Sequence, residues 1–370
     1  MRGAVFLTAS RLAALRRQAA TQTAAAMPAY STASAAAPQP TAHSIQHQER
    51  RNLEARSDTG LSLAAPPVVY HPLYSAPVLP PGHRFPMAVF GLIHRQLLDE
   101  GVVDPRQVHM PTALPSRDLL RLVHTDDFVD AFCGGRLDQQ RVRRIGFGEV
   151  VHTQALIDRT LAEVAGTILT AELALEHGLA CNTAGGTHHA FPDHGSGFCI
   201  LNDLALTAQL LLHQGRVKRV LILDLDGDGT AAVFRDQPEV FTLSVHAASN
   251  FPARKQASDL DIGLADGTAD EEYLGVVAGA LHQVLLSFAP DLVLYDAGVD
   301  THLDDALGRL ALTDAGLRRR ELLVLDSCLG RGVPLAGYVG GGYDADLAVL
   351  ARRHCWLHRA AGQLWKEHGL

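Results

Sequence analysis

The chain has 370 residues, of which 47% are hydrophobic, and it carries a formal net charge of −8 at pH 7. The apolar content is enough for a globular core, while the acidic balance disfavours direct nucleic-acid binding through bulk charge. No run of about 20 apolar residues occurs, so we predict no membrane span. The five cysteines lack CxxC spacing, which indicates reduced thiols in an intracellular compartment.

The N-terminal segment differs from the rest of the chain. No acidic residue precedes Glu49, and four arginines punctuate a run rich in Ala, Ser and Thr. This composition is typical of an organellar transit peptide, for a mitochondrion or a chloroplast. The alternative is a low-complexity tail without an address, in a protein of the cytoplasm or nucleus. We predict that residues 1–60 are disordered and that residues 61–370 form one domain.

Helical and extended patterns alternate through that domain. Helical periodicity or helix-start chemistry marks residues 88–100, a segment beginning near Thr125, residues 153–177 and a segment opened by Asn202. Unbroken apolar runs occupy residues 220–223, 240–245, 292–295 and 335–339. Such runs fit strands that are buried on both faces. We therefore predict an α/β domain with a mostly parallel central sheet flanked by helices.

Polar side chains follow three of these apolar runs, namely Asp224, His246 and Asp296. Because the site of an open α/β sheet lies outside the carboxyl ends of its strands, we expect the chemistry of the chain to gather there. His246 and the later His302 are nevertheless expected to be loop or helix-surface histidines. Residues 318–320, three consecutive arginines, are expected to form an exposed helix face.

Two adjacent histidines lie behind a glycine pair in Gly185-Gly186-Thr187-His188-His189, and Gly197-Phe198-Cys199 follows. Histidine titrates near neutral pH, so two imidazoles in one pocket can divide general-base and general-acid duties. Glycines give the backbone of such a loop angles that other residues avoid. Two exposed loop histidines are the alternative interpretation of this stretch alone.

Three further motifs accompany the histidine pair in chain order. They are Asp224-Leu225-Asp226-Gly227-Asp228-Gly229-Thr230, Asp296-Ala297-Gly298-Val299-Asp300 and Gly340-Gly341-Gly342-Tyr343. In this order and spacing the motifs resemble the histone deacetylase family, most nearly its class IV branch and its bacterial acetoin-utilisation relatives. The resemblance covers about residues 67–350. It implies an arginase/deacetylase-type fold and zinc-dependent hydrolysis of an acyl-lysine amide.

The resemblance also implies a role for each matching residue. His188 and His189 would be the general acid/base pair, oriented by the carboxylates of Asp224 and Asp228. Tyr343 would donate its hydroxyl to the developing oxyanion, and Asp226 and Asp300 would bind the zinc ion. Gly197 and Phe198 would line the acyl-lysine channel. The backbone around Asp224, Asp226, Ser244 and Val245 would hold a structural potassium ion.

One motif departs from the family pattern, in which a ligand histidine follows the second aspartate. Here Gly227 follows Asp226 directly, and three residues including that histidine are absent. Catalytic zinc sites ordinarily keep three protein ligands. Asp228 could take the empty place in an all-oxygen site for magnesium, manganese or calcium. The chain could also keep the fold without turnover, or nine nucleotides could have been dropped from the gene model at an exon edge.

The leading prediction is a metal-dependent amidohydrolase that acts on an acylated protein lysine or a similar acylated amine. One alternative is a catalytically inactive protein of the same fold that binds acyl-lysine or regulates a partner. Another is a deacetylase of small molecules such as polyamines or acetoin-like compounds. If residues 1–60 are a working address, organellar proteins or metabolites are better substrate candidates than histones.

Overall fold

The computed structural model describes residues 65–224, 229–252 and 255–370, and these belong to one compact unit that begins at Leu63. The predictions for residues 1–60, Asp226 and Asp228 lie outside the described residues. Among the described helices, none has the length and apolar composition needed to cross a bilayer.

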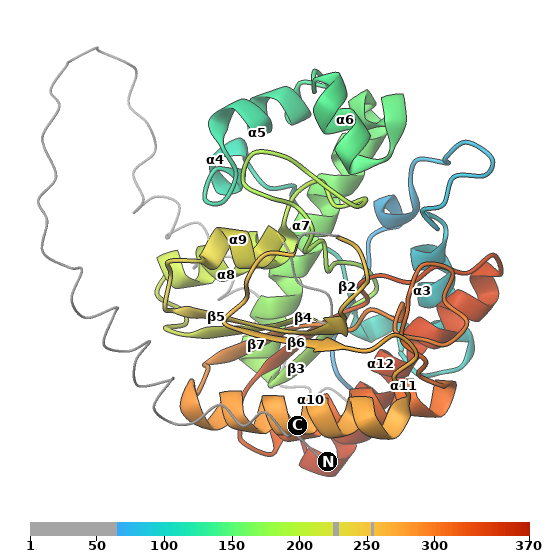
Figure 1. The fold of residues 1–370 in the computed structure, drawn as a ribbon, viewed down its shortest axis with the longest axis vertical. Helices are drawn as coiled ribbons and strands as arrows, with labels where there is room; N and C mark the ends of the chain where they lie inside the picture. Colours follow the sequence, from blue (N-terminus) through green and yellow to red (C-terminus); the bar gives the residue numbers. More distant parts are fainter. Residues whose placement is uncertain (1–64, 225–228, 253–254) are drawn as a thin grey trace, which may run out of the picture. The chain divides into compact units, whose positions relative to one another are not determined.

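An eight-stranded sheet with strand order β2-β1-β3-β8-β7-β4-β5-β6 forms the centre of this unit (Figure 1). All of its described pairs are parallel. The strands are β1 Val68–Val69, β2 Val108–His109, β3 Leu179–Asn182, β4 Val220–Asp224, β5 Val240–Ala247, β6 Leu260–Leu264, β7 Leu292–Asp296 and β8 Leu335–Tyr338. The predicted parallel sheet is confirmed, and its four predicted central runs are β4, β5, β7 and β8.

The central strands are buried on both faces, as their unbroken apolar runs predict. On β4, Leu221 and Leu223 belong to one hydrophobic cluster, whereas Val220 and Ile222 belong to another on the opposite face. This alternation follows from the two-residue period of a strand. Each face therefore needs its own layer of helices.

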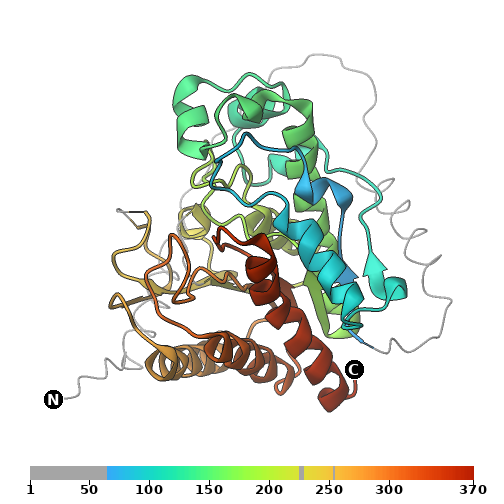
Figure 2. The ribbon, with the colours of Figure 1, turned by 90° about the vertical axis from the view of Figure 1, so that its right-hand side faces the viewer.

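Helices supply these two layers (Figures 1 and 2). One cluster joins the sheet to α3 Val89–Asp99, α10 Asp270–Ser287, α11 Asp314–Leu329 and α12 Leu347–His368. The other joins it to α7 Gln154–His177, α8 Asp203–His213 and α9 Gly229–Phe234. Thr153 and Asn202 cap α7 and α8 by accepting backbone N–H bonds, so the predicted starts of both helices are confirmed.

A third hydrophobic cluster lies around the N-terminal part of α7. It includes residues of α4 Arg117–Leu120, α5 Asp126–Cys133, α6 Gln139–Ile145 and the 3-10 turn Gly148–His152. These short helices lie above the sheet in the view of Figure 1. Shorter 3-10 turns at Pro72–Ser75 and Pro105–Gln107 complete the described helical structure.

Three expectations about exposure are wrong. His246 and His302 are buried, with 5% and 4% of their surface exposed. Arg320 is fully buried, although Arg318 and Arg319 beside it are exposed as expected. The arginine is tolerated inside because it forms an ion pair with Glu321 and donates hydrogen bonds to the carbonyls of Ala297 and Gly298.

Candidate active site

Four neighbouring strands, in the order β3-β8-β7-β4, carry the predicted site residues at their carboxyl ends. The loop after β3 carries His188 and His189, the loop after β8 carries Tyr343, and β7 ends with Asp296 just before Asp300. Asp224 is the last residue of β4. Because the strands are parallel, all four carboxyl ends lie along one edge of the sheet.

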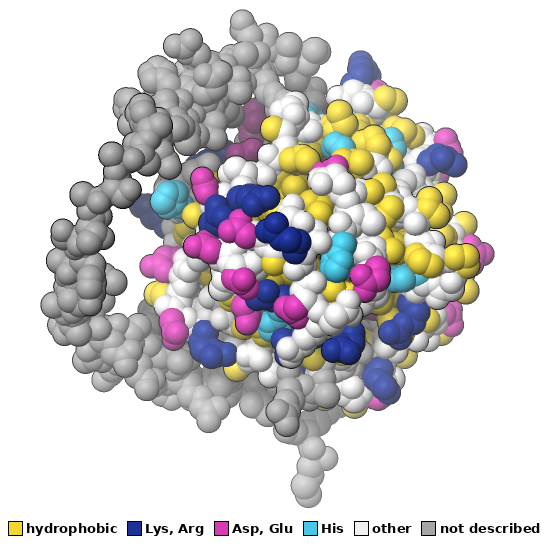
Figure 3. All heavy atoms as spheres, turned by 90° about the horizontal axis from the view of Figure 1, so that it is seen from above, with side chains coloured by type: hydrophobic (Ala, Val, Ile, Leu, Met, Phe, Trp, Pro, Cys, Tyr) yellow, Lys and Arg dark blue, Asp and Glu magenta, His cyan; other side chains and the backbone are white. Residues whose placement is uncertain are grey.

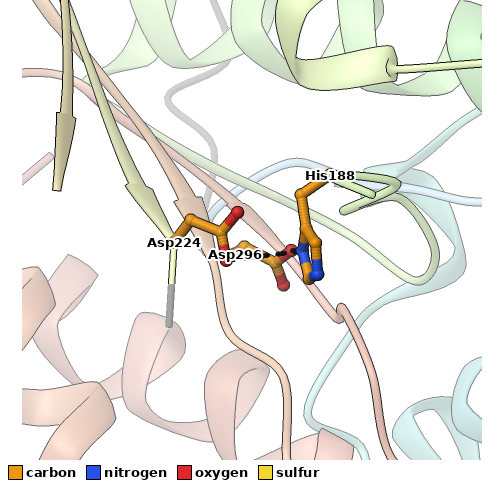
Figure 4. Close-up of side chains that lie close together, drawn as sticks. All are labelled: His188, Asp224 and Asp296. Atoms are coloured by element: carbon orange, nitrogen blue, oxygen red, sulfur yellow. Dashed lines mark hydrogen bonds and ion pairs between the residues drawn. The ribbon is translucent and has the colours of Figure 1, made fainter. Parts of the chain in front are cut away.

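Two buried carboxylates, those of Asp224 and Asp296, lie on the same side of the His188 imidazole (Figure 4). Its Nδ1 is 2.8 Å from Oδ2 of Asp296 and 3.4 Å from Oδ1 of Asp224. Burial raises the pKa of Asp296, and the hydrogen bond from His188 opposes that rise. When Nδ1–H donates to Asp296, the other ring nitrogen is left as the acceptor. Asp224 therefore contacts His188 as predicted, but Asp296 makes the shorter contact.

Two glycines leave the space that the Asp296 carboxylate occupies. Gly186 and Gly340 have φ angles of +91° and +60°. A Cβ on Gly186 would lie 2.7 Å from Oδ2 of Asp296, and one on Gly340 would lie 1.8 Å from Oδ1. Both positions therefore require glycine for conformation and for space, and the loops after β3 and β8 close on the end of β7.

The first turn of α8 fixes the backbone of the histidine loop. The fully buried carboxylate of Asp203 accepts hydrogen bonds from the backbone N–H groups of Gly186 and Thr187, at 3.1 and 2.8 Å, and from the hydroxyl of Thr167. The amide of Asn202 donates to the carbonyl of His188. Asn202 and Asp203 thus position the histidines, although the sequence alone marks them only as the start of a helix.

The segment that bears Asp300 is held from the opposite layer. The Arg320 guanidinium of α11 donates to the carbonyls of Ala297 and Gly298 and to the hydroxyl of Thr301. Loss of hydration, reinforced by the nearby Asp305 carboxylate, raises the pKa of Asp300 to about 6. The Asp305 carboxylate also accepts a hydrogen bond from the backbone N–H of Tyr343, so the loops after β7 and β8 are tied together.

A cavity of about 590 Å³ opens at this edge of the sheet, and its lining includes His189, Phe198, Phe251, Asp300 and Tyr343. The His189 ring centroid lies 4.1 Å from that of His188 and 5.2 Å from that of Phe251. Loss of hydration, followed by the nearby His188, lowers the pKa of His189 well below its ordinary value. The expected partner of His189, Asp228, lies in the stretch 225–228 that the structure does not describe.

Phe198 is held in a conformation that non-glycine residues seldom adopt. It has a φ of +68°, and Gly197 before it has a φ of +53°. Its N–H donates to the carbonyl of Ile145, and its ring centroid lies 6.2 Å from that of Tyr343. Unusual backbone angles of this kind are maintained at sites where a side chain must be aimed. Here they direct an aromatic ring onto the cavity.

A comparison with protein families now identifies this arrangement. Residues 83–358 match the family model described as the histone deacetylase domain. The chain belongs to the histone deacetylase family. Acetoin utilization protein AcuC of Bacillus subtilis is 30% identical over 325 residues, with 81% of each chain covered. Histone deacetylase 2 of Arabidopsis thaliana is 29% identical over 271 residues, with 70% of each chain covered.

One further relative of this histone deacetylase-family chain and one solved structure extend the comparison. An uncharacterized protein of Picosynechococcus is 54% identical over 302 residues, which cover 81% of this chain and 99% of the relative. The crystal structure of the HDA15 HD domain has a TM-score of 0.65 at 20% identity, covering 82% of this chain and 88% of that one. The structural match supports the fold alone. The family that the chain belongs to is one of hydrolytic deacetylases.

The described residues of this deacetylase domain fit a divalent metal ion. Ligand atoms of His188, Asp224 and Asp296 lie within 4.8 Å of one another. Oδ1 of Asp296 is buried and has no hydrogen-bond partner within the described chain. Nδ1 of His188 is occupied by its contact with Asp296, so the carboxylate oxygens are the donors left for an ion, and they suit zinc or a harder divalent cation. Asp300, at the cavity, is a further carboxylate nearby.

The histone deacetylase domain therefore brings together most residues that the sequence singles out. His188 and Asp224 share one buried cluster, and His189, Tyr343 and Phe198 share one cavity with Asp300. Gly197 also lines that cavity. Asn202, Asp203 and Phe251 were not predicted to belong to the site, and Asp296 was expected at this edge of the sheet without a role of its own. The position of Asp296 directly after an apolar run was the signal for that expectation.

Proposed function

We propose that this chain is a metal-dependent deacetylase that hydrolyses the amide of an acyl-lysine or of a similar acylated amine. The observation that carries the proposal is the convergence of His188, His189, Asp300 and Tyr343 at one edge of the sheet, where a cavity opens. A histidine pair, a phenol and carboxylates are the groups that amide hydrolysis requires.

The proposed metal ligands are Asp226 and Asp300, with Asp228, or a histidine missing from the sequence, as the third. The bound ion would polarise the amide carbonyl and acidify water. Potassium binding by the backbone around Asp224, Asp226, Ser244 and Val245 remains a prediction.

Residues of the chain would bind the substrate, transfer protons and stabilise the developing negative charge. Phe198 and Phe251 hold the alkyl chain of the substrate by apolar contact. The imidazoles of His188 and His189 take a proton from the attacking water and give one to the leaving amine as the C–N bond breaks. Asp224 and Asp296 keep the ring of His188 in place. Asp228 does the same for His189 in the case where the missing histidine, and not Asp228, is the third metal ligand. The hydroxyl of Tyr343 donates to the carbonyl oxygen as negative charge develops there.

The test is turnover and metal content in the same sample of full-length protein. We expect about one divalent ion per chain by mass spectrometry, release of acetate from an acetyl-lysine peptide, and loss of that release in chelator. Re-addition of zinc, manganese or magnesium would then show which ion restores it. A sample that binds metal and peptide but releases no acetate would contradict the proposal.

The absent ligand histidine favours a second candidate, a deacetylase-family protein that binds acyl-lysine without hydrolysing it. The metal-replete sample decides between them, because only an enzyme releases acetate. A transcript read across Asp226 and Gly227 adds an independent test: nine extra nucleotides encoding a histidine would favour the enzyme. Their absence, together with lack of turnover, would favour the binding protein.

We also propose that residues 1–60 direct the protein to an organelle. The support is their composition, which combines arginines with a lack of acidic residues before Glu49. A fluorescent fusion of residues 1–60 should enter a mitochondrion or a chloroplast. Retention of that fusion in the cytosol would overturn the proposed address.

A further inference from the structure

The two ends of the cavity differ in charge. Four arginines line it, namely Arg84, Arg143, Arg144 and Arg309, and all four are exposed. Asp300 is the single acidic residue among the lining residues that the structure describes. It lies at the inner end, where its charge interacts with those of His188 and Asp224. We call the four arginines the arginine rim.

The arginine rim comes from three segments of the chain. Arg84 follows His83, whose Nε2–H donates to the carbonyl of Gly146 at 3.2 Å, just beyond the end of α6. Arg143 and Arg144 lie in the last turn of α6. Arg309 follows Gly308, whose added Cβ would lie 1.7 Å from the carbonyl oxygen of Asp300. These contacts bring the three segments to the one cavity that all four arginines line.

Ordinary surface pairing does not account for the rim. Within the described residues, Arg84, Arg143 and Arg144 form no ion pair, and the contact of Arg309 with Asp266 is 3.5 Å long. Arg141, on the same helix as Arg143, contacts Asp127 at 2.8 Å. Acidic and basic side chains are interspersed on the face shown in Figure 3.

Stabilisation of a helix end explains only part of the rim. Cations in the last turn of a helix interact favourably with its dipole, which accounts for Arg143 and Arg144. Arg84 and Arg309 belong to loops, where no such effect applies. Four cations line one opening in a chain with a net charge of −8, and three of them have no ion pair within the described residues. This arrangement indicates a site that receives negative charge.

We propose that the arginine rim selects substrates with carboxylates beside the acylated amine, as in an acyl-lysine flanked by Asp or Glu; this inference rests on the proposed deacetylase function. The acyl end would point towards Asp300 at the inner end, and the carboxylates would stay at the mouth beside the arginines. A polyamine would place its ammonium groups among the arginines. A free acyl-amino acid has one carboxylate, which cannot contact arginines from three segments at once. An acidic peptide carries several carboxylates and is therefore the favoured substrate.

The test uses full-length protein and three acetyl-lysine peptides that differ only at the two residues on each side, which are acidic, neutral or basic. Binding is measured by fluorescence polarisation and cleavage by acetate release. We expect the acidic peptide to bind about 10-fold more tightly than the basic one at low salt, and the ratio to shrink to about 2-fold in 0.5 M salt. Equal binding of all three peptides would overturn the inference.

Variants identify the source of the preference. Arg84→Gln, Arg144→Gln and the double variant should each reduce the ratio of acidic to neutral peptide affinity. The matched control is Arg318→Gln, which removes an exposed arginine on α11 whose side chain contacts Gln363; it should leave the ratio unchanged. If the rim variants behave like the control, the rim does not select the substrate.

Two further outcomes are distinguishable. Preferential binding of the acidic peptide without any acetate release would support the rim while contradicting the proposed hydrolysis. Free Nε-acetyl-lysine with an open carboxylate serves as the small-molecule probe. If it is cleaved as efficiently as the acidic peptide, the assignment to a peptide segment is overturned.

Discussion

The inner end of the cavity and its rim are built in different ways. At the inner end, Asp296 is packed between two glycines, and Asp203 accepts hydrogen bonds from the loop that carries the histidines. At the rim, Phe251 is 52% exposed, and three of the four arginines have no described ion-pair partner. The inner end is therefore fixed by interactions within the protein, whereas the rim is free to interact with what enters. Changes at the inner end should destroy function or folding, and changes at the rim should alter affinity alone.

The largest expected effect is at Asp203. Its replacement in Asp203→Ala removes the acceptor of the backbone N–H groups of Gly186 and Thr187, while the Thr167 hydroxyl keeps only the carbonyl of Glu163. We expect the free energy of unfolding to fall by about 4 kcal/mol, measured by chemical denaturation. Asp236→Ala, at an exposed position, is the control and should change it little. A small effect at Asp203 would mean that the inner end is not held as described.

The second largest effect is expected at Tyr343, on catalysis and not on stability. Tyr343→Phe removes a hydroxyl from the cavity wall and keeps the ring. We expect kcat/KM for an acetyl-lysine peptide to fall by about 100-fold or more, equivalent to about 3 kcal/mol, with an unchanged melting temperature. Tyr70→Phe, which alters a tyrosine stacked on His94, is the control for loss of a phenol. Full activity of the Tyr343 variant would remove this residue from the mechanism.

The third prediction concerns the pH dependence of the free energy of unfolding, and its expected size is close to the 3 kcal/mol given for Tyr343. It rests on His124, which supports the start of α8. Its Nδ1–H donates to the carbonyl of Phe191, and its Nε2 accepts from the N–H of Asn202, both at 3.0 Å, so the folded protein holds the neutral ring. Burial lowers its pKa from 6.5 to about 4. Between these values the unfolded chain binds a proton that the folded chain does not. The free energy of unfolding should therefore fall as the pH drops from about 6.5 to 4, by about 2 to 3 kcal/mol.

Denaturation curves from pH 4 to 8 give the free energy of unfolding of the original protein and of each variant, and the difference between them measures the contribution of His124. His124→Gln should lose the part of the pH dependence that belongs to His124. His213→Gln, at an exposed helical position, should retain the full pH dependence of the original protein. Parallel curves for His124→Gln and the unchanged protein would show that His124 does not contribute.

The smallest expected effect is at the rim. Phe251→Ala removes an exposed ring that contacts His189 edge-to-face. We expect KM to rise by about 5-fold, equivalent to about 1 kcal/mol, with little change in unfolding. Leu286→Ala, which alters an exposed leucine on α10, is the control and should leave KM unchanged. A large loss of stability in the Phe251 variant would remove the contrast between the two regions.

The sequence predicted the centre of the sheet better than its edges. The runs of β4, β5, β7 and β8 are continuous because both of their faces are buried, and that signal is local. Edge strand β6 includes the exposed Asp261 and Gly263, and its residues alternate in burial. It therefore lacks an unbroken apolar run. The interior strand β3 contains no β-branched or aromatic residue, so its sequence carried no strand signal.

Contacts between distant segments were predicted only where a motif signalled them. His188 and Asp296 are 108 residues apart, and their 2.8 Å contact follows from strand order rather than from spacing along the chain. The burial of Arg320 depends on Glu321 and on carbonyls more than twenty residues away. The sequence could not reveal these arrangements, because a charged residue is predicted to be exposed until its partners are known.

The bonds between Asp203 and the histidine loop have a consequence for heating. Asp203 belongs to the first turn of a helix and at the same time supports the backbone beside His188. That helix packs on the sheet through Leu204 and Leu211. Loosening of the histidine loop and melting of the helix are therefore one event. Thermal inactivation and loss of helical signal should share a single midpoint, with no temperature range in which an intact fold is inactive.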